Sequence, residues 1–165
     1  MIGVDDIDDM VAAPKEIAGR PQWDKSRDTT VRLKAPLWIG EEIVGGLFLI
    51  ATASVVATPQ HGSLVLVFQD QPIQRLDAFP SAPHANPFKN VPKELRGLTL
   101  PSGDHQFHTW QHNRRWPRPP KDNLPIAAPI DPPLVDYRAA IDFFLTRTNI
   151  HGMIPLPPHE PRLSV

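Results

Sequence analysis

The chain has 165 residues, the usual size of one domain, with a formal net charge of −1 and no cysteine. The lack of cysteine excludes disulfides, thiolate metal ligands and a cysteine nucleophile, and it fits a reducing compartment. Proline accounts for 21 residues, well above the average of about 5%, so much of the chain is expected to be loop or extended arm.

The charge is distributed unevenly. Residues 1–28 carry seven acidic and four basic side chains, a local charge of −3, whereas residues 85–121 carry seven basic and two acidic ones, a local charge of +5. This asymmetry is compatible with a polyanion at the centre, with the acidic segment folding over it, or with two solvated surfaces. The first ten residues contain four aspartates and no base, unlike a secretory signal, so we expect a cytoplasmic protein.

Three regions are expected along the chain. Residues 1–28 lack a sustained apolar period and contain Pro14 and Pro21, which predicts an acidic arm with one short helix near residues 5–12. Residues 29–150 are expected to form a single β-rich domain. Residues 151–165 read as a proline-rich tail that is extended or docks in a groove.

The first half of the domain reads as strands. Apolar side chains alternate over residues 29–39, and Pro36 indicates an edge or a bulge. Residues 43–60 carry no charge, but they are slightly fewer than the about 20 that a membrane-spanning helix needs. Their β-branched content favours a buried strand bent at Gly45-Gly46, so we expect no membrane association.

Two further strands follow. Residues 63–68 are apolar on both faces, which is typical of a central strand. In the next strand, residues 73–79, Arg75 and Asp77 lie two positions apart, so they share one face and can pair.

The second half begins with a proline-rich loop. Residues 79–97 are expected to contain one helical turn at 91–96. Residues 98–113 read as a hairpin around Pro101-Ser102-Gly103, with its second strand at about 105–111, and residues 114–133 read as extended.

The last element is a helix. Asp131 is expected to be its N-cap, with Pro132 and Pro133 in the first turn and an end near Thr148. Its apolar stripe comprises Leu134, Tyr137, Ile141, Phe144 and Leu145. The sequence therefore predicts a mainly β (α+β) fold: a small bent antiparallel sheet or partly open barrel of five to six strands, one C-terminal helix packed on it, and proline-rich arms.

Histidines are concentrated near the basic segment. His105, His108 and His112 are residues that zinc accepts as ligands. On a strand, however, His105 points away from the face of the other two, so one metal centre needs a bulge or a remote ligand such as His84 or Asp77. We therefore expect neither a metal nor another cofactor. No P-loop, GxGxxG, GxSxG or HExxH motif is present.

The same side chains suit metal-free phosphodiester cleavage, which needs a base, an acid and cations for the developing charge. His108 and His84 are candidates for the base and the acid, with Asp77 orienting a partner. The candidates for phosphate contacts are Arg75, Arg114 and Arg115, and those for base stacking are Trp110 and Trp116. The alternative interpretation is that these residues build a polar end of the sheet.

A set of short motifs carries a resemblance over residues 63–150. They are LVLVF, Arg75-Leu-Asp77, His84-Ala-Asn86-Pro87, Gln106-Phe-His108-Thr-Trp110 and FFLTRTNI. In this order they resemble a family of short bacterial and phage-associated proteins without an established activity. In that family a histidine stands at Gln106 and a tyrosine at Trp110, which leaves a mechanism with paired histidines in doubt. The resemblance implies that one site gathers Arg75, Asp77, His84, Asn86, His108 and Trp110, and it suggests a toxin or defence role.

Two functions remain open from the sequence. The first is recognition of RNA or a nucleotide at this face rich in histidine, arginine and tryptophan, with metal-free ribonuclease activity as its catalytic form. The second is a non-catalytic interaction module, or a small subunit of a larger complex, that docks on a protein partner through residues 1–28 and 151–165.

Overall fold

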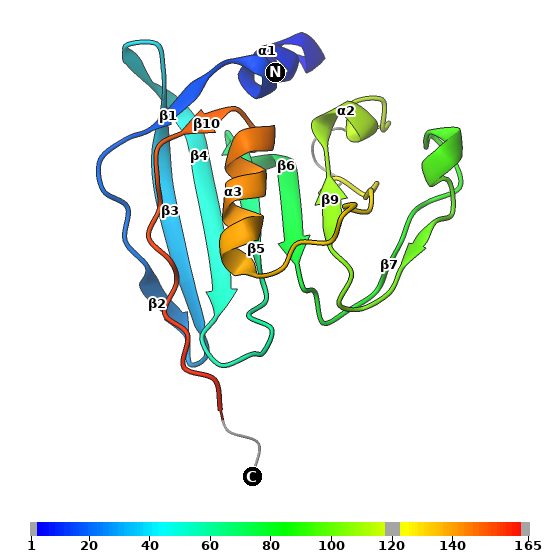
Figure 1. Ribbon diagram of the computed structural model, residues 1–165. Helices are drawn as coiled ribbons and strands as arrows, with labels where there is room; N and C mark the ends of the chain where they lie inside the picture. The colour runs from blue at the N-terminus through cyan, green and yellow to red at the C-terminus, as the bar shows by residue number, and fades with distance from the viewer. Residues whose placement is uncertain (1–2, 118–122, 163–165) are drawn as a thin grey trace.

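A curled, open β-sheet with a helix on one face forms the body of the protein (Figure 1). The computed structural model describes residues 3–117 and 123–162. Parts of three predicted segments, residues 1–2 of the arm, 118–122 of the extended stretch and 163–165 of the tail, lie outside the described residues.

Eight strands of the described chain make up the main sheet. Seven follow the order β10-β1-β3-β4-β5-β6-β9, and β2 pairs separately with β3. All pairs are antiparallel except β1 with β10. The strands are β1 (Lys15–Ile17), β2 (Asp24–Arg27), β3 (Thr30–Ile39), β4 (Glu42–Ser54), β5 (Gly62–Phe68), β6 (Gln71–Ala78), β9 (Gln106–His108) and β10 (Ile150–His151).

The predicted mainly β architecture with a bent open sheet is confirmed. The predicted number of five to six strands is wrong. The additional strands β1, β2 and β10 come from the terminal segments, and two to four residues are too few to show an apolar period.

The core lies between the sheet and α3 (Tyr137–Arg147). Alternate residues of the strands face it, as the period of two requires: Leu33 and Ala35 in β3, Leu49 and Ala51 in β4, and Leu64 and Leu66 in β5. From α3 the buried residues are Tyr137, Ala140, Ile141, Phe144 and Leu145.

The predicted start of this helix is wrong. Its N-cap is Asp136, whose side chain accepts a hydrogen bond of 2.8 Å from the backbone N–H of Ala139. The predicted cap, Asp131, and the following Pro132 each precede a proline, which disfavours the helical conformation at both positions. The helix therefore begins only after this proline pair.

The uncharged stretch forms β4 up to Ser54. Opposite Gly45 and Gly46, the pairing of β3 with β4 shifts between Pro36 and Trp38, as expected for a bulge at these glycines. Among the described residues, no helix has the length and apolarity needed to span a membrane.

A small second unit flanks the sheet beyond β9 (Figure 1). Here β7 (His84–Ala85) pairs with β8 (Thr99–Leu100), and a turn of 3-10 helix, η1 (Lys93–Leu95), lies between them where a helical turn was predicted. We call residues 84–100 the lobe. The predicted hairpin over 98–113 is wrong, because β8 pairs with β7 whereas β9 pairs with β6.

The strand predicted at 105–111 ends at His108. It is followed by a short helix, α2 (Trp110–Asn113), because the side chain of Thr109 accepts a hydrogen bond of 3.2 Å from the His112 N–H and caps the turn. Because of this helix, His112 does not lie on the sheet, where a longer strand would have placed it.

Both terminal segments pack on the same chain. The predicted short helix is α1 (Val4–Ala12), and Ile7 is buried in the core. The fully buried Lys15 donates to the carbonyls of Met10, Val11 and Ala13 at the end of α1, and its burial lowers its pKa to about 8. In the tail Ile154 is buried, and the Pro155 carbonyl accepts from the Trp23 indole.

Candidate functional site

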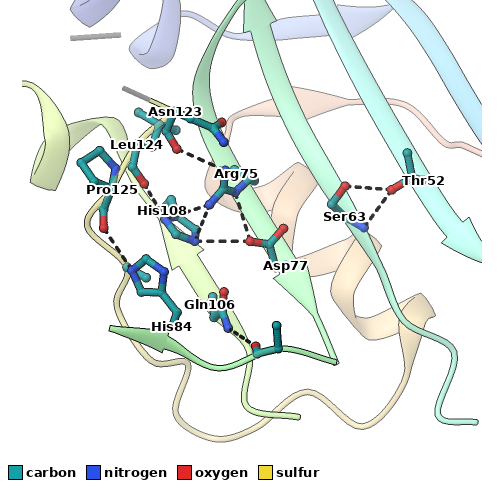
Figure 2. Close-up of polar contacts among 12 residues, drawn as sticks. Thr52, Ser63, Arg75, Asp77, His84, Gln106, His108, Asn123, Leu124 and Pro125 are labelled. Carbon is teal, nitrogen blue, oxygen red and sulfur yellow. Dashed lines mark hydrogen bonds and ion pairs between the residues drawn. The ribbon is translucent and has the colours of Figure 1, made fainter. Parts of the chain in front are cut away.

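Arg75, Asp77 and His108 form one contact network on the sheet face opposite α3 (Figure 2). Arg75 is the cross-strand partner of His108, and Asp77 lies two residues farther along β6. Arg75 Nε lies 3.0 Å from Asp77 Oδ2, His108 Nε2 lies 3.3 Å from the same oxygen, and Arg75 Nη2 lies 2.9 Å from His108 Nε2. The predicted pairing of Arg75 with Asp77 is therefore present.

Backbone carbonyls fix the outer ends of this network. His108 Nδ1 is 2.6 Å from the Leu124 carbonyl, which can only accept, so this nitrogen carries the proton. In the neutral ring Nε2 is then an acceptor for Arg75 Nη2. Arg75 Nη1 donates to the Asn123 carbonyl at 3.1 Å. The network thus joins the sheet to the backbone of Asn123 and Leu124.

Burial controls the protonation of the network. It lowers the pKa of His108, although the Asp77 carboxylate beside it acts in the opposite direction. Burial raises the pKa of Asp77, but contact with the His108 ring and the Arg75 charge together outweigh it and hold that pKa below the usual 3.8. At neutral pH the network therefore consists of a neutral imidazole and an arginine–carboxylate pair.

His84 and Asn86 adjoin the network from the lobe. The His84 and His108 rings meet edge to face with their centres 5.0 Å apart. His84 Nε2 lies 3.0 Å from both the Pro125 carbonyl and Asn86 Oδ1. The buried Asn86 amide donates to the Leu95 and Ala127 carbonyls and accepts from the Ala127 N–H. The structure thus brings five of the predicted site residues together.

These contacts serve packing more directly than catalysis. The His108 side chain is 0% exposed, and both ring nitrogens already have partners. A general base must reach the proton that it abstracts, and no atom of His108 is open to a substrate in this arrangement. The network instead holds the lobe and residues 123–127 against the sheet.

Asp77 also faces a shallow depression of about 300 Å³. Thr52, Ser63 and Gln106 line it as well, because they lie in one cross-strand row with Asp77. The Thr52 and Ser63 hydroxyl oxygens are 2.8 Å apart, and Gln106 Nε2 donates to the Ala82 carbonyl. Sequence reasoning missed these three residues, since only the strand register aligns them.

Trp110 and Arg114 contact the acidic N-terminal helix. Trp110 is 2% exposed, so its ring offers no face to a nucleobase in this structure, and its Nε1 donates to Asp8 Oδ1 at 2.7 Å. Arg114 forms an ion pair with the same carboxylate. The hydrogen bonds from Arg114 and Trp110 lower the pKa of Asp8. The acidic segment therefore folds over one part of the basic region.

Another part of the basic region lines a groove between the lobe and α2, with a volume of about 690 Å³. We call it the arginine groove. Its cations include Arg96 and Arg115, both exposed, and the acidic residue in its lining is Glu94. The lining residues are Asn90, Val91, Pro92, Glu94, Arg96, Gln111, His112, Arg114 and Arg115. Of the predicted nucleic-acid contacts, Arg114 and Arg115 lie here.

His112 contributes an unsatisfied polar atom to this groove. Its Nδ1 is buried and, within residues 3–117 and 123–162, has no hydrogen-bond partner. Burial lowers the pKa of His112, and the Glu94 charge partly opposes this effect.

The histidines do not gather around one point. The ring of His105 contacts Phe79 and faces the Leu134 carbonyl, whereas His108 lies in the network and His112 in the arginine groove. The expectation that His108 and His112 share one strand face is wrong, because α2 begins between them. In the described part of the chain, no three His, Cys, Asp or Glu residues are grouped as metal ligands.

The described contacts define a buried polar network and an open cationic groove next to each other. The resemblance over residues 63–150 remains a prediction. Comparisons of this chain with protein-family models, curated proteins and solved structures found no match.

Proposed function

We propose that the protein recognises RNA through its phosphates and that the arginine groove is the binding surface. The observation that carries this proposal is the lining of the groove, in which three arginines accompany a single carboxylate. Arginine presents a planar fork of donors that matches the oxygens of a phosphate. A groove with an excess of such groups is suited to a polyanionic backbone.

Arg96 and Arg115 are the expected phosphate contacts. Both side chains are exposed, and among the described residues Arg96 has one hydrogen-bond contact, a long one of 3.5 Å with the Val91 carbonyl. The charge of Arg114 is balanced by Asp8, so Arg114 is expected to contribute less. His112 lines the same groove, and in its protonated form it would add a positive charge for an oxyanion.

Binding without cleavage fits these contacts better than ribonuclease activity. The candidate base His108 is enclosed by Arg75, Asp77 and Leu124, away from solvent. The alternative of a module that docks through its two ends needs those ends to be free. Here Ile7 and Ile154 are buried against the chain's own core, and the arginine groove stays open.

Replacement of Arg115 by glutamine tests the groove. We expect Arg115→Gln, and separately Arg96→Gln, to weaken binding of a fluorescent RNA oligomer, measured by anisotropy. The slope of log affinity against log salt should become shallower by about 0.7 for each lost phosphate contact on a single strand. Arg32→Gln is the matched control, since Arg32 is exposed on β3 and does not line the groove.

Equal effects of Arg115→Gln and Arg32→Gln on both affinity and salt slope would contradict the proposal. They would mean that RNA responds only to the overall charge of the protein. Wild-type protein that shows no salt-dependent binding at all would contradict it as well.

His112 makes the binding dependent on pH. A bound phosphate favours the imidazolium form, so it should raise the pKa of His112 from the lowered value of the free protein. Because the bound state then holds the proton more tightly, affinity should rise as the pH falls from about 7.5 to about 5.5, by about three- to tenfold. Glu94, Arg96, Arg114 and Arg115 also line the groove. Anisotropy with His112→Gln should give a flatter profile; an unchanged profile would exclude His112 as the cause.

A further inference from the structure

We infer that Phe88 is a stacking platform for a nucleobase and that the RNA bound in the arginine groove is therefore single-stranded. This inference rests on the proposed function, because it extends the same binding surface by one residue of the lobe. It replaces Trp110, which is buried, with an aromatic side chain that is open to solvent.

Phe88 is a large apolar side chain with 75% of its surface exposed. It lies in the lobe with two exposed cations close by in the chain: Lys89 follows it directly, and Arg96 precedes Gly97, the glycine that its ring contacts. Isolated exposed apolar residues are common on protein surfaces. An exposed aromatic ring next to a groove lined by cations is instead the combination that proteins use to bind single strands.

The ring is supported from below. A Cβ atom placed on Gly97 would come within 2.5 Å of Phe88 Cε1, so the ring packs closely on a position where no side chain is present. The Gly97 N–H donates to the Pro87 carbonyl at 3.2 Å, and the Asn86 N–H donates to the Leu98 carbonyl at 2.9 Å. Because this support is already ordered, stacking a base on the ring loses little conformational entropy.

The platform adjoins the arginine groove. Arg96, next to Gly97, lines the groove, and so does Asn90, two residues after Phe88. Figure 1 shows the lobe projecting beside α2, which supplies the opposite wall. A strand whose phosphates contact Arg96 and Arg115 can therefore place a neighbouring base on Phe88.

The ligand class follows from base geometry. In a duplex both faces of each base are covered by neighbouring pairs, whereas an unpaired strand can turn a base out onto an aromatic ring. Stacking is tolerant of sequence, since every base has a π-face. We therefore expect single-stranded RNA to be preferred over duplex RNA, with little base specificity at this position.

Binding of a uridine oligomer of about 12 nucleotides to the full chain tests this inference. Phe88→Ala should weaken binding by about tenfold, and Phe88→Trp should bind as the wild type does. Val135→Ala is the matched control, because Val135 is 84% exposed and lies outside the groove lining. Duplex RNA of the same length should bind more weakly and should not respond to Phe88→Ala. The thermal midpoint of each variant checks its fold.

The outcomes separate this inference from the proposed function. If Arg115→Gln weakens binding but Phe88→Ala binds like Val135→Ala, the platform is overturned and the arginine groove stands. If neither Arg115→Gln nor Phe88→Ala has an effect, both proposals fail. Duplex RNA that binds as tightly as the single strand would also overturn the inference.

Discussion

Arg75→Ala is expected to lower the free energy of unfolding by about 3 kcal/mol, the lower end of the cost of removing one partner of a buried ion pair, because the Arg75 and Asp77 side chains are 17% and 23% exposed. Without the guanidinium, the Asp77 carboxylate would face the acceptor nitrogen of His108 at 3.3 Å with no cation between them. The Asn123 carbonyl would lose its donor as well. Urea denaturation followed by circular dichroism, with linear extrapolation to water, measures the change.

Two further variants separate the network from a general effect of charge. Arg32→Ala removes an exposed arginine from β3 and should change stability by no more than about 0.5 kcal/mol. Arg75→Met combined with Asp77→Leu replaces the ion pair by apolar side chains and should recover much of the loss. A loss for Arg75→Ala as small as that for Arg32→Ala would show that the ion pair is not a stabilising contact.

Asn86→Ala is expected to loosen the lobe and to lower the free energy of unfolding by about 2–4 kcal/mol. The substitution leaves the Leu95 and Ala127 carbonyls and the Ala127 N–H without their partner, and buried groups left unpaired cost about 1–3 kcal/mol each. Because Asn86 ties the lobe to residues 123–127, hydrogen exchange should accelerate in both segments before it does in β4.

The same variant should also weaken RNA binding, since the lobe supplies one wall of the arginine groove. Thr99→Ala is the matched control, because Thr99 is an exposed residue of the same small sheet. Mass spectrometry of exchanged peptides gives the local rates. If exchange in residues 84–100 is as slow in Asn86→Ala as in Thr99→Ala, the amide is not what holds the lobe.

Local patterns predicted the central sheet well. The alternation in residues 29–39 and the apolar run at 63–68 specify β3 and β5, because one face of each strand must be buried. The pairing of Arg75 with Asp77 followed from their spacing of two on a strand. The contact between the His84 and His108 rings could not be predicted from spacing, because it depends on where residues 123–127 pack.

The binding surface was less predictable. The excess of positive charge indicated the region, and Arg115 was named from it, but the groove forms only when η1 and α2 come together. A tryptophan suits both a core and a stacking surface, and sequence reasoning chose the surface for Trp110. The Thr109 cap begins a helix at that position, and Trp110 is buried there. Phe88 lies in a loop whose sequence has no periodic apolar pattern, so the neighbouring residues did not identify it as a platform.

The parallel pairing of β1 with β10 has a consequence for the order of folding. Lys15 pairs with Ile150, and its N–H donates to the Asn149 carbonyl, so the first strand of the sheet is completed by the last one. During synthesis β1 can pair with β3 early, but its other edge stays unpaired until β10 has been synthesised. Contacts between such distant segments form slowly, so β1 and α1 should be the last elements to gain protection in a refolding experiment.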